Sequence, residues 1–126
     1  MSNITTLRIK IQNPQIDILK EAVKLMAEHF NLETTDTVSD FFGRKVEGVV
    51  GLKGRILPRG IGFAIVNNQL MAVGDPYGYR ETYNILAKSI KQYYIAAQQM
   101  IALKMLGYQP TIQRQKEKLV ITAVSL

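Results

Sequence analysis

The sequence predicts an α+β domain in which a single antiparallel sheet of about five to six strands carries two helices on one face, in the order β-α-β-β-β-α-β-β. Three observations lead to this class. Period-two alternation of apolar and polar residues marks strands near both ends of the chain, and apolar residues spaced by three and four mark two helices. Most strands are joined by short connections, which is typical of antiparallel pairing. Because 126 residues is the length of one domain, we expect a single domain spanning 1–126.

The first strand and the first helix are predicted on opposite sides of Asn13-Pro14. Apolar residues alternate with polar ones from Thr6 to Gln12, which indicates a strand with one buried face. A helix is expected to begin at Asn13-Pro14, with Asn as the N-cap and Pro at the first helical position. Its apolar stripe consists of Ile16, Leu19, Val23, Met26 and Phe30.

The next region changes character twice. From Asn31 to Gly43 the chain turns polar and acidic, with Glu33, Asp36 and Asp40 before Phe41-Phe42, and this pattern predicts a loop or a short edge strand. Residues 46–52 are typical of a strand. The stretch from Lys53 to Arg59 contains Gly54 and Pro58 and predicts an exposed basic loop.

A β-hairpin is predicted around Asn67-Asn68, a dipeptide that tolerates the positive φ angles of a tight turn. A two-residue turn at this point fixes the register of the two strands. The expected pairs are Ile65 with Leu70, Phe63 with Ala72, Ala64 with Met71, and Gly62 with Val73. Because both faces of the hairpin are apolar, it belongs in the middle of the sheet. A turn cluster follows at residues 74–79.

The longest periodic stretch runs from about Arg80 to Leu106 and predicts a helix that ends at Gly107, where a left-handed cap belongs. Its stripe consists of Tyr83, Leu86, Ile90, Tyr93, Ala97 and Met100. A second hairpin is expected over residues 111–124, turning at Lys116-Glu117. The sheet face away from both helices is expected to be exposed or to meet a partner.

Composition excludes several classes of function. The chain has no Cys and one His, so disulfides, a thiolate nucleophile and a Cys-ligated or His-rich metal site are excluded. We expect no cofactor, no catalytic residue and no enzymatic activity. No apolar run has the length of a signal peptide core or a membrane span, which predicts a soluble, cytoplasmic protein.

Positive charge is concentrated in the middle and the C-terminal third of a chain whose net charge is +6. Cations in a flexible loop can neutralise phosphates, and exposed tyrosines beside them can stack on bases or anchor a protein interface. The candidate binding residues are Arg44, Lys45, Lys53, Arg55, Arg59, Tyr77, Tyr79, Arg114, Lys116 and Lys118. The alternatives are a solvated loop for the first group and edge-strand protection for the last three.

Four further residues have both a structural and a functional interpretation. Tyr83 and Tyr93 fall on the buried stripe of the long helix, which favours core packing. Asp75 is interpreted as a turn-forming or capping side chain, with a functional carboxylate as the alternative. His29 lies near the end of the first helix, where a structural role is favoured.

Several short motifs resemble the family called domain of unknown function 1257. They are the GIGF sequence at residues 60–63, Asp75 after the hairpin, Gln92 with Tyr94 on the long helix, and Gly107 with Tyr108 at its end. The resemblance covers most of the chain and implies the same fold. Because members are often encoded near AAA-type ATPases, it also implies membership of a larger complex.

Together these observations predict a small non-enzymatic accessory or adaptor subunit. It would bind a larger protein or ribonucleoprotein assembly through the open sheet face and the basic loop. The alternative is a module that binds RNA, DNA or the ribosome directly through the basic loop and the C-terminal hairpin. Association with further copies of the chain is left open.

Overall fold

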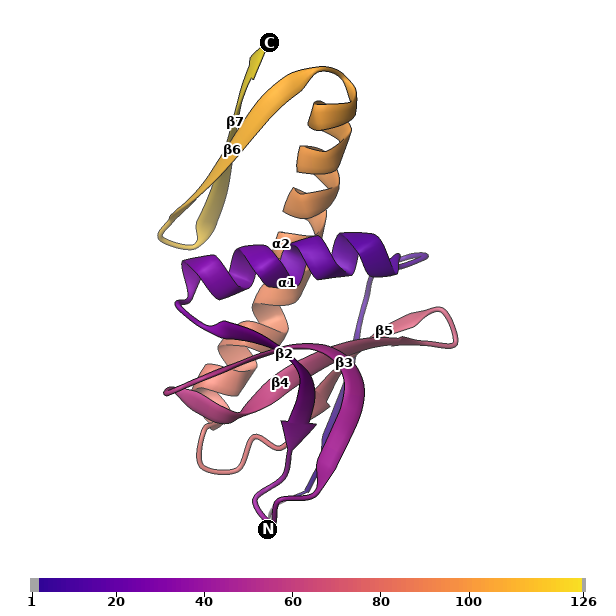
Figure 1. Cartoon of the computed structure of the whole chain (residues 1–126), viewed down its shortest axis with the longest axis vertical. Coiled ribbons are helices and arrows are strands. Elements are labelled where there is room, and N and C mark those ends of the chain that lie inside the picture. The colour runs from indigo at the N-terminus through magenta and orange to yellow at the C-terminus, as the bar shows by residue number, and fades with distance from the viewer. Residues whose placement is uncertain (1–2, 126) are drawn as a thin grey trace.

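The structure is a computed structural model that describes residues 3–125. Within this range two helices and seven strands form a five-stranded antiparallel sheet and a separate two-stranded one (Figure 1). In chain order the elements are β1 Thr5–Ile9, α1 Ile16–His29, β2 Glu33–Ser39, β3 Lys45–Gly54, β4 Leu57–Val66, β5 Gln69–Gly74, α2 Arg80–Met105, β6 Tyr108–Gln115 and β7 Lys118–Ser125. The predicted α+β class is confirmed. The predicted order β-α-β-β-β-α-β-β is one strand short, because four strands (β2 to β5) rather than three lie between the two helices.

The hairpin of β4 and β5 lies inside the larger sheet, whose strand order is β1-β5-β4-β3-β2. Asn67 and Asn68 have φ angles of 51° and 61°, as a two-residue hairpin turn requires. The register follows, with Ile65 opposite Leu70 and all other predicted pairs in place. The position, turn and register of this hairpin were therefore predicted correctly.

Both helices pack on the same face of the larger sheet. Leu19, Val23 and Met26 of α1 and the buried stripe of α2 meet the side chains of Ile61 and Phe63 in one continuous core. The expected start of α1 was wrong, because Asn13 adopts a φ of 47° and forms a turn, and the helix begins only at Ile16. In place of a side-chain cap, the Gln15 N–H donates to the Tyr94 hydroxyl of α2 at 2.8 Å.

Residues 31–59 contain more strand than the sequence predicts. The acidic segment was expected to be a loop or a short edge strand. It contains the edge strand β2, which has seven residues. The predicted basic loop was wrong. Strand β3 extends to Gly54 and β4 begins at Leu57, which is buried, so only Arg55 and Ile56 form the turn.

The face of the sheet away from the helices is partly covered by the chain itself. Strands β2 and β3 bend over it where their register shifts between Thr35 and Thr37. Val38 and Val49 of this ribbon are buried there with Val73 of β5. The approach is close enough that a Cβ on Gly62 would lie 2.7 Å from Cγ2 of Val49. This replaces the expectation of an exposed or partner-covered sheet face.

The last two strands do not join the larger sheet, which corrects the prediction of a single sheet. Helix α2 has 26 residues and extends past α1, beyond the five strands, and the β6–β7 hairpin lies beside that extension (Figure 1). The chain reverses at Gly107, whose φ of 88° confirms the predicted left-handed cap. Because the reversal occurs far from the sheet, the returning strands pack on α2.

Candidate functional site

The turn between β2 and β3 is organised around a buried carboxylate, Asp40, which is 2% exposed. Its Oδ1 accepts the backbone N–H groups of Phe42 and Arg44, each at 2.9 Å. Its Oδ2 accepts Nε of Arg44 at 2.6 Å. Burial alone would raise the pKa of Asp40, but these backbone amides and the Arg44 guanidinium hold the pKa below its ordinary value. The turn is therefore fixed by a charged group at its centre.

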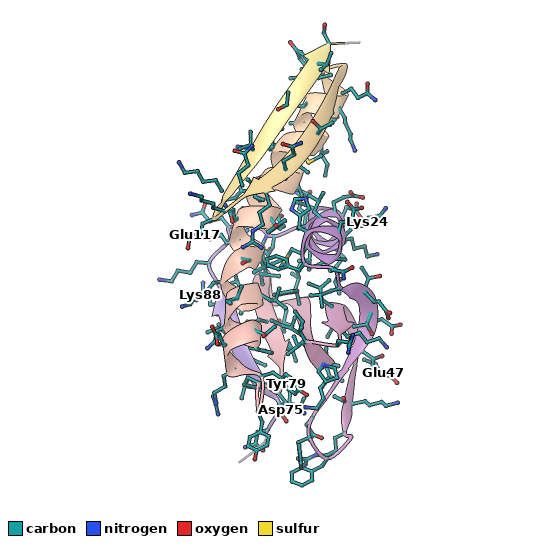
Figure 2. All side chains as sticks on the ribbon, turned by 90° about the vertical axis from the view of Figure 1, so that its left-hand side faces the viewer. Lys24, Glu47, Asp75, Tyr79, Lys88 and Glu117 are labelled. Atoms are coloured by element: carbon teal, nitrogen blue, oxygen red, sulfur yellow. The ribbon has the colours of Figure 1, made fainter. Side chains whose placement is uncertain are left out.

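A second buried carboxylate, Asp75, joins this turn to the segment between β5 and α2. Asp75 is 1% exposed, and its Oδ2 accepts the backbone N–H of Phe41 at 2.9 Å. Its Oδ1 accepts the N–H of Tyr77, two residues on, at 3.1 Å, which is the local turn predicted from the sequence. Figure 2 shows Asp75 at the end of the molecule remote from β6–β7, close to Tyr79. The carboxylate thus holds two distant parts of the chain together.

Three aromatic rings project from these two turns. The rings of Phe41 and Phe42 are edge to face with centroids 5.5 Å apart, and the rings of Phe41 and Tyr77 are edge to face at 5.4 Å. Their side chains remain largely in solvent, with exposed fractions of 56% for Phe41, 69% for Phe42 and 43% for Tyr77. Exposed aromatic clusters of this kind are typical of interaction sites.

Two arginines border the rings. The guanidinium carbon of Arg59 lies 5.7 Å from the centroid of the Phe41 ring and 5.3 Å from that of Tyr79, and its Nη2 donates to the backbone carbonyl of Tyr77. The guanidinium of Arg44 lies 5.8 Å from the Phe42 ring. We call the group Phe41, Phe42, Arg44, Arg59 and Tyr77 the aromatic tip.

The structure divides the ten candidate residues into two groups. Arg44, Arg59, Tyr77 and Tyr79 come together at the aromatic tip, with Lys45 next in the chain. The others lie at the end of β3, in the β3–β4 turn and in the β6–β7 hairpin. They are Lys53, Arg55, Arg114, Lys116 and Lys118.

The second group is only partly assembled, around Phe30 at the end of α1. The guanidinium of Arg114 lies 4.3 Å from the centroid of the Phe30 ring. Arg55 lines a hollow of about 430 Å³ together with Phe30. Lys116 is in the turn of the hairpin and Lys118 begins β7, and the backbone carbonyl of Glu117 between them accepts a hydrogen bond from Nε2 of Gln92 at 2.9 Å.

The tyrosines of the α2 stripe are core residues, as predicted. Tyr93 is 1% exposed, its hydroxyl lies 2.9 Å from Nδ1 of His29, and burial raises its pKa. This contact gives His29 a structural role. Tyr83 is 4% exposed, and burial, to which the charge of Asp75 adds, raises its pKa to about 12. The nearby Thr5 hydroxyl donates instead to the Gly74 carbonyl at 3.2 Å.

Phe41, Phe42 and Asp40 were not among the candidates from the sequence. The available signal was the run Asp40-Phe41-Phe42-Gly43-Arg44, which places two large apolar residues in a turn between Asp and Gly. An apolar pair has no reason to occupy a solvated turn unless the rest of the chain or a partner covers it.

The structure provides two findings on other classes of site. Within residues 3–125, no three His, Asp or Glu side chains gather closely enough to hold a metal ion. Neither α1 nor α2 carries an apolar stretch long enough to span a bilayer.

Comparisons with protein-family models, with curated proteins and with solved structures find no match. The resemblance to domain of unknown function 1257 stays a prediction.

Proposed function

We propose that this protein is a non-enzymatic accessory subunit in the cytoplasm that docks on a larger protein through the aromatic tip. The observation that carries the proposal is the chain of three edge-to-face rings, each more than two-fifths exposed, at one end of a well-packed domain. Aromatic and Arg side chains are the residues that contribute most to binding at protein interfaces.

The tip is also prepared for binding before a partner arrives. Asp40 and Asp75 fix the backbone on which Phe41, Phe42 and Tyr77 stand. A partner that covers the rings therefore orders few additional groups, which reduces the cost of association. Burying one Phe side chain contributes about 1.5–3 kcal/mol.

Charge at the tip favours a protein over a phosphate-rich partner. The positive charge of Arg44 is paired with Asp40, and Asp75 lies beneath the rings. The local excess of positive charge is small. The alternative proposal is direct nucleic-acid or ribosome binding through the β3–β4 turn and the β6–β7 hairpin. In its favour, Arg55 lines a hollow with Phe30, and Arg114 lies over the same Phe30 ring.

The test is affinity capture from the native source with the tagged wild-type chain and two variants. Wild type and Met105→Ala should retain the same stoichiometric partner after nuclease treatment, while Phe42→Ala should lose it. Met105 is the matched control because it is also apolar and 84% exposed but ends α2 at the opposite end of the molecule. Retention of the partner by Phe42→Ala would contradict the proposal, and loss only after nuclease treatment would favour the alternative. Light scattering on the purified chain measures self-association.

A further inference from the structure

A polar groove of about 710 Å³ lies at the edge of the larger sheet, where the end of β1 meets the β4–β5 turn and the middle of α2. Arg8 lines it from β1, Lys10 from the residue after that strand, and Lys91 from α2. Amide side chains supply five of the other six lining residues, among them Asn13 and Asn68. The groove lies outside the aromatic tip and contains none of the ten candidate residues.

The three cations of the groove have no counter-charge. None of the lining residues is acidic, and Arg8, Lys10 and Lys91 form no salt bridge or side-chain hydrogen bond with any other residue in the described range 3–125. By contrast, Arg44 is paired with a carboxylate and Arg114 lies over an aromatic ring. Three unneutralised cations around one concave surface focus a positive potential on it.

The rim of the groove is held by a side-chain contact between two turns. Nδ2 of Asn68, in the β4–β5 turn, donates to Oδ1 of Asn13 at 3.0 Å. Both residues have positive φ angles, so each turn is locally constrained. The contact uses the oxygen of Asn13 and leaves its amide N–H groups available as donors to a ligand.

The lining chemistry selects the ligand class. Lys, Arg and side-chain amides are the groups that contact phosphate oxygens. Ile11 is the one apolar residue that lines the groove, so an apolar anchor of a protein partner has little to contact. A second hollow of about 240 Å³ shares Lys10, Asn13 and Lys91 with the first and extends it along α2. The residues that line only this extension are Gln15, Gln98, the buried Tyr94 and the part-exposed Ile95. The site is therefore elongated, which fits successive phosphates better than a single one.

We infer that this groove binds the phosphodiester backbone of a nucleic-acid strand, with Arg8, Lys10 and Lys91 each contacting a phosphate. Because no exposed aromatic ring lines the groove, recognition is of the backbone and independent of base sequence. This second ligand goes beyond the proposed docking of a protein at the aromatic tip.

The test is fluorescence anisotropy of a labelled, random-sequence single-stranded oligonucleotide at several salt concentrations. Each lost phosphate contact should reduce the slope of log K against log salt by about 0.7 and weaken binding about fivefold at 0.1 M salt. Lys91→Ala should show one such loss, and the triple variant Arg8→Ala, Lys10→Ala, Lys91→Ala should show three.

Lys24→Ala is the matched control because it removes the same charge from an exposed position on the other helix. Lys88 precedes Lys91 on α2 by one turn, and Figure 2 shows Lys24 on the opposite side of the molecule from Lys88. Lys24→Ala should bind the oligonucleotide as wild type does, and so should Phe42→Ala, whatever becomes of the proposed protein partner. Equal weakening by Lys24→Ala and Lys91→Ala would overturn the inference, as would absence of binding by wild type. If inorganic phosphate competes with the oligonucleotide at an equal concentration of phosphate groups, the groove binds free phosphate. That result would overturn the inference that it binds a nucleic-acid strand.

Discussion

Removal of the Asp75 carboxylate tests whether this side chain stabilises the two turns that carry the aromatic tip. In Asp75→Ala the backbone N–H groups of Phe41 and Tyr77 lose an acceptor at 2.9 Å and 3.1 Å. A hydrogen bond to a charged group contributes about 1.5–3 kcal/mol, and a buried donor left without a partner adds to the loss. Since Phe41 and Tyr77 are exposed, water partly replaces the carboxylate. We therefore expect the free energy of unfolding to fall by about 2–4 kcal/mol.

The assay is urea denaturation at pH 7, with Asp75→Asn as a graded companion. Asn retains one acceptor oxygen, so it should cost about half as much as Ala. The Asn variant also removes the negative charge that raises the pKa of Tyr83, so that pKa should fall from about 12. An Asp75→Ala chain as stable as wild type within about 0.5 kcal/mol would refute the bracing role.

Three other predictions concern the core and the turn. Gly62→Ala should lower the free energy of unfolding by about 1–3 kcal/mol because the new Cβ would meet Val49. Val49→Ala in the same chain should remove most of that loss. If the two substitutions instead lower the free energy of unfolding additively in a double-mutant cycle, residues 62 and 49 do not touch. Tyr83→Phe should be neutral or slightly stabilising in thermal denaturation, since within residues 3–125 the buried hydroxyl has no hydrogen-bond partner. Because the folded pKa of Tyr83 is about 12 against an ordinary 10.0, wild type should lose stability as pH rises from 10 to 12, and Tyr83→Phe should lose less. The lowered pKa of Asp40 acts in the opposite direction, because its stabilisation is present above the ordinary pKa of 3.8 and is lost as pH falls through the lowered pKa. The protection factors of the Phe42 and Arg44 amides, which correct for the pH dependence of intrinsic exchange, should therefore fall in that pH range. Protection factors that stay constant with pH would contradict this.

Features set by neighbouring residues were predictable from the sequence. Asn67-Asn68 determines a two-residue turn, and that turn fixes the register of β4 against β5. The buried stripe of α2 and the cap at Gly107 follow from helical spacing and from the freedom of glycine at positive φ.

Features set by distant contacts were not predictable in this way. Gly54 and Pro58 suggest a loop, but pairing of Gly54 with Leu57 carries both strands to within two residues of each other. The aromatic tip depends on Asp75 meeting the amide of Phe41, 34 residues earlier in the chain, and on the bend of β2 and β3 that brings them together. Periodicity within a segment carries no information on such a bend.

The dissociation constant of the captured partner tests the docking proposal most directly. Isothermal titration of Phe42→Ala against that partner should show about tenfold to hundredfold weaker binding than wild type, since the variant forfeits the burial of one ring. Met105→Ala should bind as wild type does, and both variants should unfold at the wild-type urea concentration because both side chains are exposed. Equal dissociation constants for wild type and Phe42→Ala would place the docking surface elsewhere on the molecule.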